Sequence, residues 1–143
     1  MPNDLLLEHA AAAARAFLTP DRRSRLLALL DGGNPKHWRK FESELAGSFS
    51  AHLDPRWARR LAPPEEHPAE VERLLRDAGA PDVCVVLRDG GSAGGEVPLG
   101  AALEYAVGSG CGVLVSCVPG VLAYHEAETC ERYVLHRPAD GRT

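Results

Sequence analysis

The chain has 143 residues, a length that usually forms one domain with its own hydrophobic core. Hydrophobic residues make up 45% and charged residues 25%, which excludes collagen-like and disordered chains and fits an ordinary globular protein. The formal net charge of −4 argues against a dedicated nucleic-acid-binding or membrane-surface protein. We therefore expect a single domain over residues 1–143, with a helical part over about 1–80 and a sheet part over about 81–137.

Prolines that follow a polar residue mark the starts of helices in the first half of the chain. Proline is tolerated at the first helical position because the amide there has no partner within the helix. Thr, Asn and Asp in the preceding position can cap the free amides of the first turn. Together with a helix that precedes the first of these prolines, the pattern predicts helices over residues 3–18, 20–31, 35–47, 55–61 and 68–78.

The helix expected over residues 35–47 shows the helical period most clearly. Trp38, Phe41 and Leu45 recur at a spacing that puts them on one face, which we expect to pack on the core. The charged side chains of this helix are then expected to point away from the core: Arg39, Lys40, Glu42 and Glu44.

The second half of the chain is typical of strands. Short runs rich in β-branched residues predict strands over residues 83–87, 112–117, 121–126 and 132–136, with a helix over 98–107 between the first two. Helices followed by a β-α-β-β-β order predict an α+β fold, in which a helical half packs on one face of a small, mainly antiparallel sheet.

The register of the central hairpin decides which side chains can meet. A two-residue Pro119-Gly120 loop would place Leu114 opposite His125 and would put Cys117 and His125 on opposite faces of the sheet. A three-residue loop would bring Cys117 and His125 to the same face, so the sequence leaves this point open.

The block from Gly108 to Glu126, closed by Glu131–Leu135, resembles the end of a family of short bacterial proteins of unknown activity. The segment Leu18–Arg23 is similar to a helix opening in the same group. The resemblance implies a small bacterial cytosolic protein and carries no catalytic or binding residue with it.

The ends and the cysteines indicate the compartment. Asp4 and Glu8 stand where a signal peptide would carry basic residues, and we expect a cytoplasmic protein with four reduced thiols. Residues 105–124 carry no charge, but glycine and proline interrupt them, so we expect no membrane-spanning segment.

Several residue combinations could carry chemistry. One alternative is a small enzyme in which Cys117 is the nucleophile and His125 the base, with Glu126 as a nearby acid. Cys111, Cys117, His125 and Cys130 lack the close ligand pairs typical of zinc sites, and the glycine-rich loop Asp89–Glu96 lacks a phosphate-loop spacing. We therefore expect no metal and no cofactor, and interpret the loop as a flexible connection.

Basic residues gather in the first part of the chain, although the whole chain is acidic. In the helix expected over 55–61, Arg56, Arg59 and Arg60 would share one face, and Arg39 and Lys40 form part of a second group. Such groups are often ordinary solvated surface, but arginine also recognises carboxylates and phosphates. We predict that these five residues bind a partner.

The resulting functional prediction is a non-catalytic protein-binding or regulatory module, whose partner presents an acidic surface. The enzyme with Cys117 and His125 is one alternative. A weak nucleic-acid binder that uses the arginines of residues 22–60 is the other, and only a few phosphate contacts would be available to it.

Overall fold

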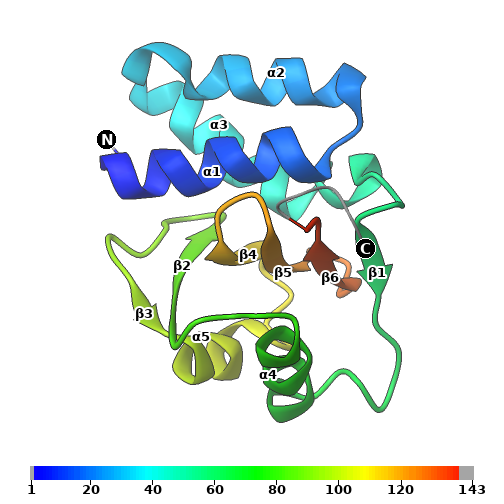
Figure 1. Cartoon of the computed structure of the whole chain (residues 1–143). Coiled ribbons are helices and arrows are strands. Elements are labelled where there is room, and N and C mark those ends of the chain that lie inside the picture. The colour runs from blue at the N-terminus through cyan, green and yellow to red at the C-terminus, as the bar shows by residue number, and fades with distance from the viewer. Residues whose placement is uncertain (1, 139–143) are drawn as a thin grey trace.

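A computed structural model describes residues 2–138 and shows an antiparallel sheet between two layers of helices (Figure 1). The helices are α1 (Asp4–Phe17), α2 (Pro20–Leu30), α3 (Pro35–Ala46), α4 (Pro68–Asp77) and α5 (Leu99–Ala106), with short 3-10 turns at Asp31–Gly33 and Ser50–His52. The strands are β1 (Ala58–Arg60), β2 (Val83–Arg88), β3 (Val97–Pro98), β4 (Val113–Val118), β5 (Leu122–Glu126) and β6 (Arg132–His136). They lie side by side in the order β1-β6-β5-β4-β2-β3, which confirms the predicted α+β class.

The predicted helix starts are confirmed where proline opens α2, α3 and α4. The Asn34 side chain caps α3 by accepting a hydrogen bond from the Lys36 amide at 2.9 Å. Asn3 does the same for α1, where its side chain accepts from the Leu6 amide at 2.9 Å. These caps supply partners to amides that the helices themselves cannot satisfy.

The helices cover both faces of the sheet, so the expectation that they pack on one face is wrong. In Figure 1, α1, α2 and α3 lie on one side of the sheet, and α4 and α5 lie on the other. Every residue of β5 is buried, as is all of β4 except its last residue. Strands with apolar side chains on both faces need a layer on each side, and the sequence run of β4 already has this composition.

The prediction of a helix over residues 55–61 is also wrong. Asp54 accepts hydrogen bonds from the Arg56 amide through its side chain and from the Trp57 amide through its carbonyl, which makes a turn. The chain then enters β1, which pairs with β6 and places Arg59 opposite Val134. A seven-residue helix is marginal alone, and the hydrogen bonds of the sheet edge replace it.

The central hairpin has the predicted pairing in its main part, with Leu114 opposite His125. Of the two loop lengths that the sequence leaves open, the structure has the three-residue one, because Val118 pairs with Leu122. An irregularity at Cys117 takes up the extra residue, so the alternation of the rest of β4 is unchanged.

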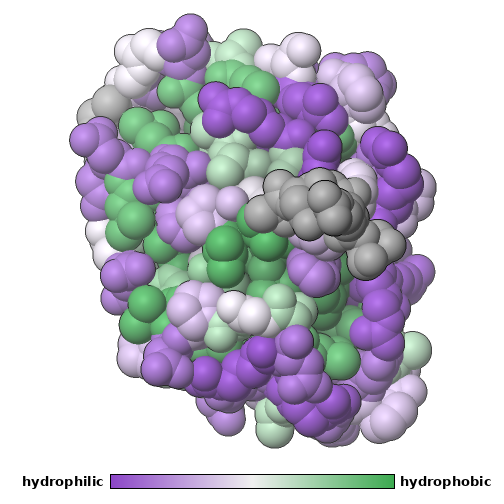
Figure 2. All heavy atoms as spheres, in the orientation of Figure 1, coloured by the Kyte–Doolittle hydropathy of each residue, from purple (hydrophilic) through white to green (hydrophobic). Residues whose placement is uncertain are grey.

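Polar side chains surround a central apolar band on the face drawn in Figure 2, at the level where the β4–β5 turn lies in Figure 1. Within residues 2–138, none of the helices has the length and apolar composition needed to span a membrane.

Candidate binding site

A cleft of about 470 Å³ lies where β2, β3 and α5 meet. We call it the α5 cleft. The loop between β2 and β3 forms one wall and α5 forms the other. Its lining residues are Val86, Arg88, Gly91, Ser92, Ala93, Val97, Ala101, Ala102 and Tyr105. The volume falls in the range of sites that bind small molecules.

The floor of the α5 cleft is apolar because of strand alternation and small helix residues. Val86 and Arg88 are two residues apart on β2, so both point to the face that α4 and α5 cover. Val97 comes from β3, opposite Cys84 of β2. Ala101 and Ala102 on α5 have short side chains, and this leaves open space above the floor.

Arg88 and Tyr105 form the polar rim of the α5 cleft. The Arg88 guanidinium donates from Nη1 to the Tyr105 hydroxyl at 2.7 Å and from Nε to the Gly91 carbonyl at 2.7 Å. It also lies 5.5 Å from the centre of the Tyr105 ring, within cation–π distance. Two acceptors and a ring therefore hold the guanidinium, while Tyr105 remains 46% exposed.

The Tyr105 hydroxyl lies 3.7 Å from the sulfur of Cys111, whose thiol in turn donates to Ser109 at 3.2 Å. Partial burial raises the pKa of Tyr105 above its ordinary value, and the neighbouring Cys111 acts in the same direction. The phenol is therefore neutral at physiological pH and has a proton to donate.

The loop between β2 and β3 is held in place, although its glycines suggested a flexible connection. Glu42 of α3 accepts from the amide and the hydroxyl of Ser92, at 3.0 and 2.6 Å. The Ser92 hydroxyl also accepts from the Arg88 amide at 3.1 Å. Asn3, before α1, donates to the Gly94 carbonyl at 2.5 Å. Two segments of the helical layer therefore fix one wall of the cleft.

Glu42 and Glu44 are buried, contrary to the expectation that they face solvent. Glu42 reaches the loop as described, and Glu44 accepts hydrogen bonds from Arg25 and from Ser48. The partners Arg25, Ser48 and Ser92 lie outside α3, so the period of α3 alone could not reveal the burial of the two carboxylates. Donors from those segments compensate for the burial of the two carboxylates.

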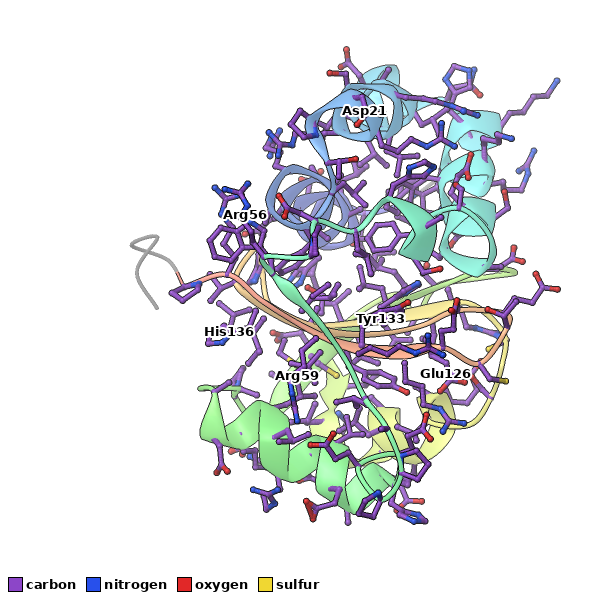
Figure 3. All side chains as sticks on the ribbon, turned by 90° about the vertical axis from the view of Figure 1, so that its right-hand side faces the viewer. Asp21, Arg56, Arg59, Glu126, Tyr133 and His136 are labelled. Carbon is purple, nitrogen blue, oxygen red and sulfur yellow. The ribbon has the colours of Figure 1, made fainter. Side chains whose placement is uncertain are left out.

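The predicted arginine group does not share one face. Arg59 and Arg60 are neighbours on a strand and point to opposite sides of the sheet. Arg56 and Arg59 both line a second cleft, of about 340 Å³, and Figure 3 shows Arg59 next to α4. Each of the three arginines also has a carboxylate of its own chain: Arg56 pairs with Asp54, Arg59 with Glu65 and Arg60 with Glu131.

The second predicted group lies on the exposed side of α3. Lys40 forms an ion pair with Glu44 at 3.8 Å. Arg39 is exposed, and no ion pair is found for it within residues 2–138. The partner-binding role of Arg39, Lys40, Arg56, Arg59 and Arg60 stays a prediction, now without the common helical face on which part of it rested.

The structure separates Cys117 and His125. Cys117 packs with the α4 and α5 side of the sheet, while the His125 ring packs on Phe49 at 4.9 Å, on the other side. Burial raises the pKa of Cys117 to about 12 and lowers that of His125 to about 4. A buried thiol and a buried imidazole on opposite faces cannot exchange a proton, so this candidate pair is not formed.

Glu126, the acid expected beside that pair, is fully buried in a network of its own. It accepts from the amides of Gly108 and Gly110 at 2.8 and 2.6 Å, from Tyr124 at 2.8 Å and from Arg132 at 3.0 Å. Burial raises the pKa of Glu126, but these hydrogen bonds outweigh burial and lower it overall. The carboxylate thus fastens the loop before β4 to β6.

Sequence reasoning missed a serine–histidine contact. The Nδ1 atom of His9 on α1 lies 2.6 Å from the hydroxyl of Ser116 on β4. Burial lowers the pKa of His9, and Ser116 is only 1% exposed. The pair lies between α1 and the sheet and joins two layers of the fold, and neither residue lines the α5 cleft.

In the part of the chain that the structure describes, no three His, Cys, Asp or Glu side chains come together as a metal site. Comparisons with protein-family models, with curated proteins and with solved structures find no match to this chain. The resemblance to short bacterial proteins therefore stays a prediction.

Proposed function

We propose that this chain is a non-catalytic protein-binding module and that the α5 cleft holds an apolar side chain of its partner. The observation that carries the proposal is an apolar cleft of about 470 Å³ with a fixed arginine–tyrosine pair at its rim. Apolar pockets with a few placed polar groups are the usual form of a binding site. Interface energy is commonly concentrated where one anchoring side chain fills such a pocket.

The rim suits a partner that brings negative charge. Arg88 is the cationic residue among those that line the cleft, and its guanidinium is oriented by Gly91 and Tyr105. Fixed donors bind an acceptor with a smaller loss of side-chain entropy than free ones. This retains the acidic partner expected from the sequence and assigns it to a different surface.

We further infer that the module acts in the bacterial cytoplasm. All four cysteines are free thiols. Burial raises the pKa of Cys84 to about 11 and that of Cys117 to about 12, so these two thiols are protonated and unreactive at neutral pH. Unpaired thiols of this kind are typical of a reducing compartment.

A substitution that fills the cleft tests the proposed function. Ala101 lines the cleft from an exposed position on α5, so Ala101→Trp should occupy the space without disturbing the core. Ala69→Trp, at an exposed position on α4, is the matched control. Both proteins would be immobilised and exposed to a pool of synthetic ten-residue peptides, and retained peptides would be identified by mass spectrometry.

We expect wild type and Ala69→Trp to retain the same peptides, each with an apolar residue at a fixed place, and Ala101→Trp to lose them. Circular dichroism and thermal unfolding would establish that both variants are folded. Retention of the same peptides by a folded Ala101→Trp variant, or no retention by wild type, would contradict the proposed function.

A further inference from the structure

Resting on the proposed function, we infer that the α5 cleft recognises the C-terminal residue of the partner chain. Arg88 and Tyr105 bind the terminal carboxylate, and the apolar floor takes the side chain of that last residue. The inference rests on the donors left free at the rim, on their position beside the floor, and on the charges around them.

The Arg88 guanidinium has N–H donors that its contacts to Gly91 and Tyr105 do not use. A guanidinium carries five N–H groups, and the contacts to Gly91 and Tyr105 use one on Nε and one on Nη1. Within residues 2–138, no carboxylate lies within ion-pair distance of Arg88, in contrast to Arg56, Arg59 and Arg60. The remaining N–H groups are therefore available to an anionic ligand at the mouth of the cleft.

Tyr105 supplies a second donor next to the first. Its oxygen accepts from Arg88, so its own proton points elsewhere. The neighbour on that side is the sulfur of Cys111 at 3.7 Å, and sulfur is a weak acceptor. A ligand oxygen would be a stronger acceptor for this proton than the Cys111 sulfur. Arg88 and Tyr105 thus present donors to the two oxygens of one carboxylate.

A chain end fits this arrangement better than an acidic side chain does. In a C-terminal residue, the carboxylate and the side chain leave the same Cα atom, so both can be bound a few ångströms apart. At Asp or Glu the carboxylate ends the side chain, and no apolar group lies beyond it to reach Val86 and Val97 on the floor. The adjacent floor therefore selects an apolar last residue.

The surroundings also favour one negative charge over two. Asp89 and Glu96 lie in the loop that walls the cleft, and both are exposed. Their charges would repel a phosphate dianion more strongly than a carboxylate. The loop glycines, which suggest a phosphate cradle in other proteins, therefore do not indicate one here.

The test uses six-residue peptides of sequence Gly-Ser-Gly-Ser-Gly-X with a fluorophore at the N-terminus, where X is Leu, Phe, Val or Ser. Each is made with a free carboxyl end and with a C-terminal amide. Binding is measured by fluorescence anisotropy to wild type, Tyr105→Phe, Arg88→Gln and Ala101→Trp. Arg73→Gln, which changes an exposed arginine of α4, is the control for a lost surface charge.

We expect the free-acid peptides with X = Leu, Phe or Val to bind wild type and Arg73→Gln equally. Amidation or Arg88→Gln should weaken binding about tenfold or more, as loss of a charge-assisted hydrogen bond does. Tyr105→Phe removes one donor to the ligand and one acceptor of Arg88 from a side chain that is 46% exposed. It leaves the charge of Arg88 in place and should weaken binding by a smaller factor, which keeps the test decisive even where Arg88→Gln fails to fold.

One outcome would overturn the inference and leave the proposed function intact. It is equal binding of the acid and amide forms, with both lost in Ala101→Trp, which would indicate an internal apolar segment. Displacement of the peptide by 4-methylpentanoate at the same molar concentration would indicate a site for a small apolar acid, and it would contradict both the inference and the proposed function. Binding of the free acids that persists in folded Ala101→Trp would likewise contradict both the inference and the proposed function.

Discussion

At the rim of the α5 cleft, the Gly91 carbonyl and the Tyr105 hydroxyl fix the plane of the Arg88 guanidinium. Lysine could not take this role, because its ammonium group has no planar fork and would satisfy at most one of the two acceptors in the same geometry. The last residue of β2 must therefore be an arginine, and a positive charge alone does not suffice.

His125 gives the molecule a pH dependence. Its ring is fully buried, Nδ1 contacts the Val113 carbonyl at 3.0 Å and Nε2 has no partner within the described chain. Burial lowers the pKa of His125 from 6.5 to about 4, so the unfolded chain binds a proton before the folded one does. Its contribution to stability is complete above pH 6.5 and is lost as the pH falls toward 4.

We expect this loss to reach about 3 kcal/mol at pH 4 and below. The measurement is urea unfolding of wild type and His125→Leu between pH 7.5 and 4. The free energy of unfolding of the variant should fall less steeply with pH, while His37→Leu, at an exposed histidine, should follow wild type. Burial also lowers the pKa of His9, which is present in wild type and in both variants. Part of the fall of the unfolding free energy with pH therefore remains in all three proteins. Parallel curves for wild type and His125→Leu would show that His125 does not titrate as described.

At the scale of elements, β4 lies in the middle of the sheet and both of its faces are covered. Leu114 is fully buried on the side of α1, α2 and α3, in one core with Phe17 and Phe41. Leu114→Ala should therefore lower the free energy of unfolding by about 2–5 kcal/mol, the usual range for a buried leucine. Denaturant unfolding would measure it. A loss of less than about half a kcal/mol would indicate a solvent-facing strand.

Local patterns predicted most elements, because helix starts at proline and the alternation of strands depend on neighbouring residues. The exceptions depend on distant partners. The segment after Asp54 becomes β1 because it pairs with β6. Glu42 is buried because it accepts hydrogen bonds from Ser92, which lies 50 residues away in the sequence. No local period contains that information.

The cleft was harder to predict than the fold for the same reason. It is assembled from β2, the following loop, β3 and α5, and its floor consists of common residues such as Val86 and Ala102. The sequence showed a glycine-rich loop between a strand and a helix, which is a place where sites occur. It did not show that Arg88 and Tyr105, 17 residues apart, would meet.

At the scale of the whole molecule, one sheet separates two cores with different roles. The side of α1, α2 and α3 holds the three buried phenylalanines and the buried His9 and His125. The side of α4 and α5 holds Tyr124 among mostly aliphatic residues and opens into the α5 cleft. Contacts from Asn3 and Glu42 to the cleft loop connect the two layers, so the stable helical layer supports the binding wall.

The most direct test of the central claim is a map of amide chemical shifts in ¹⁵N-labelled protein, titrated with the free-acid Gly-Ser-Gly-Ser-Gly-Leu peptide. The account predicts that the largest changes fall on Val86, Val97, Ala101 and Tyr105, around the α5 cleft. Amides of β1 and of the exposed side of α3 should stay unchanged. Changes centred on Arg59 and Arg60, with the cleft unaffected, would contradict the account and would place binding at the edge of the sheet.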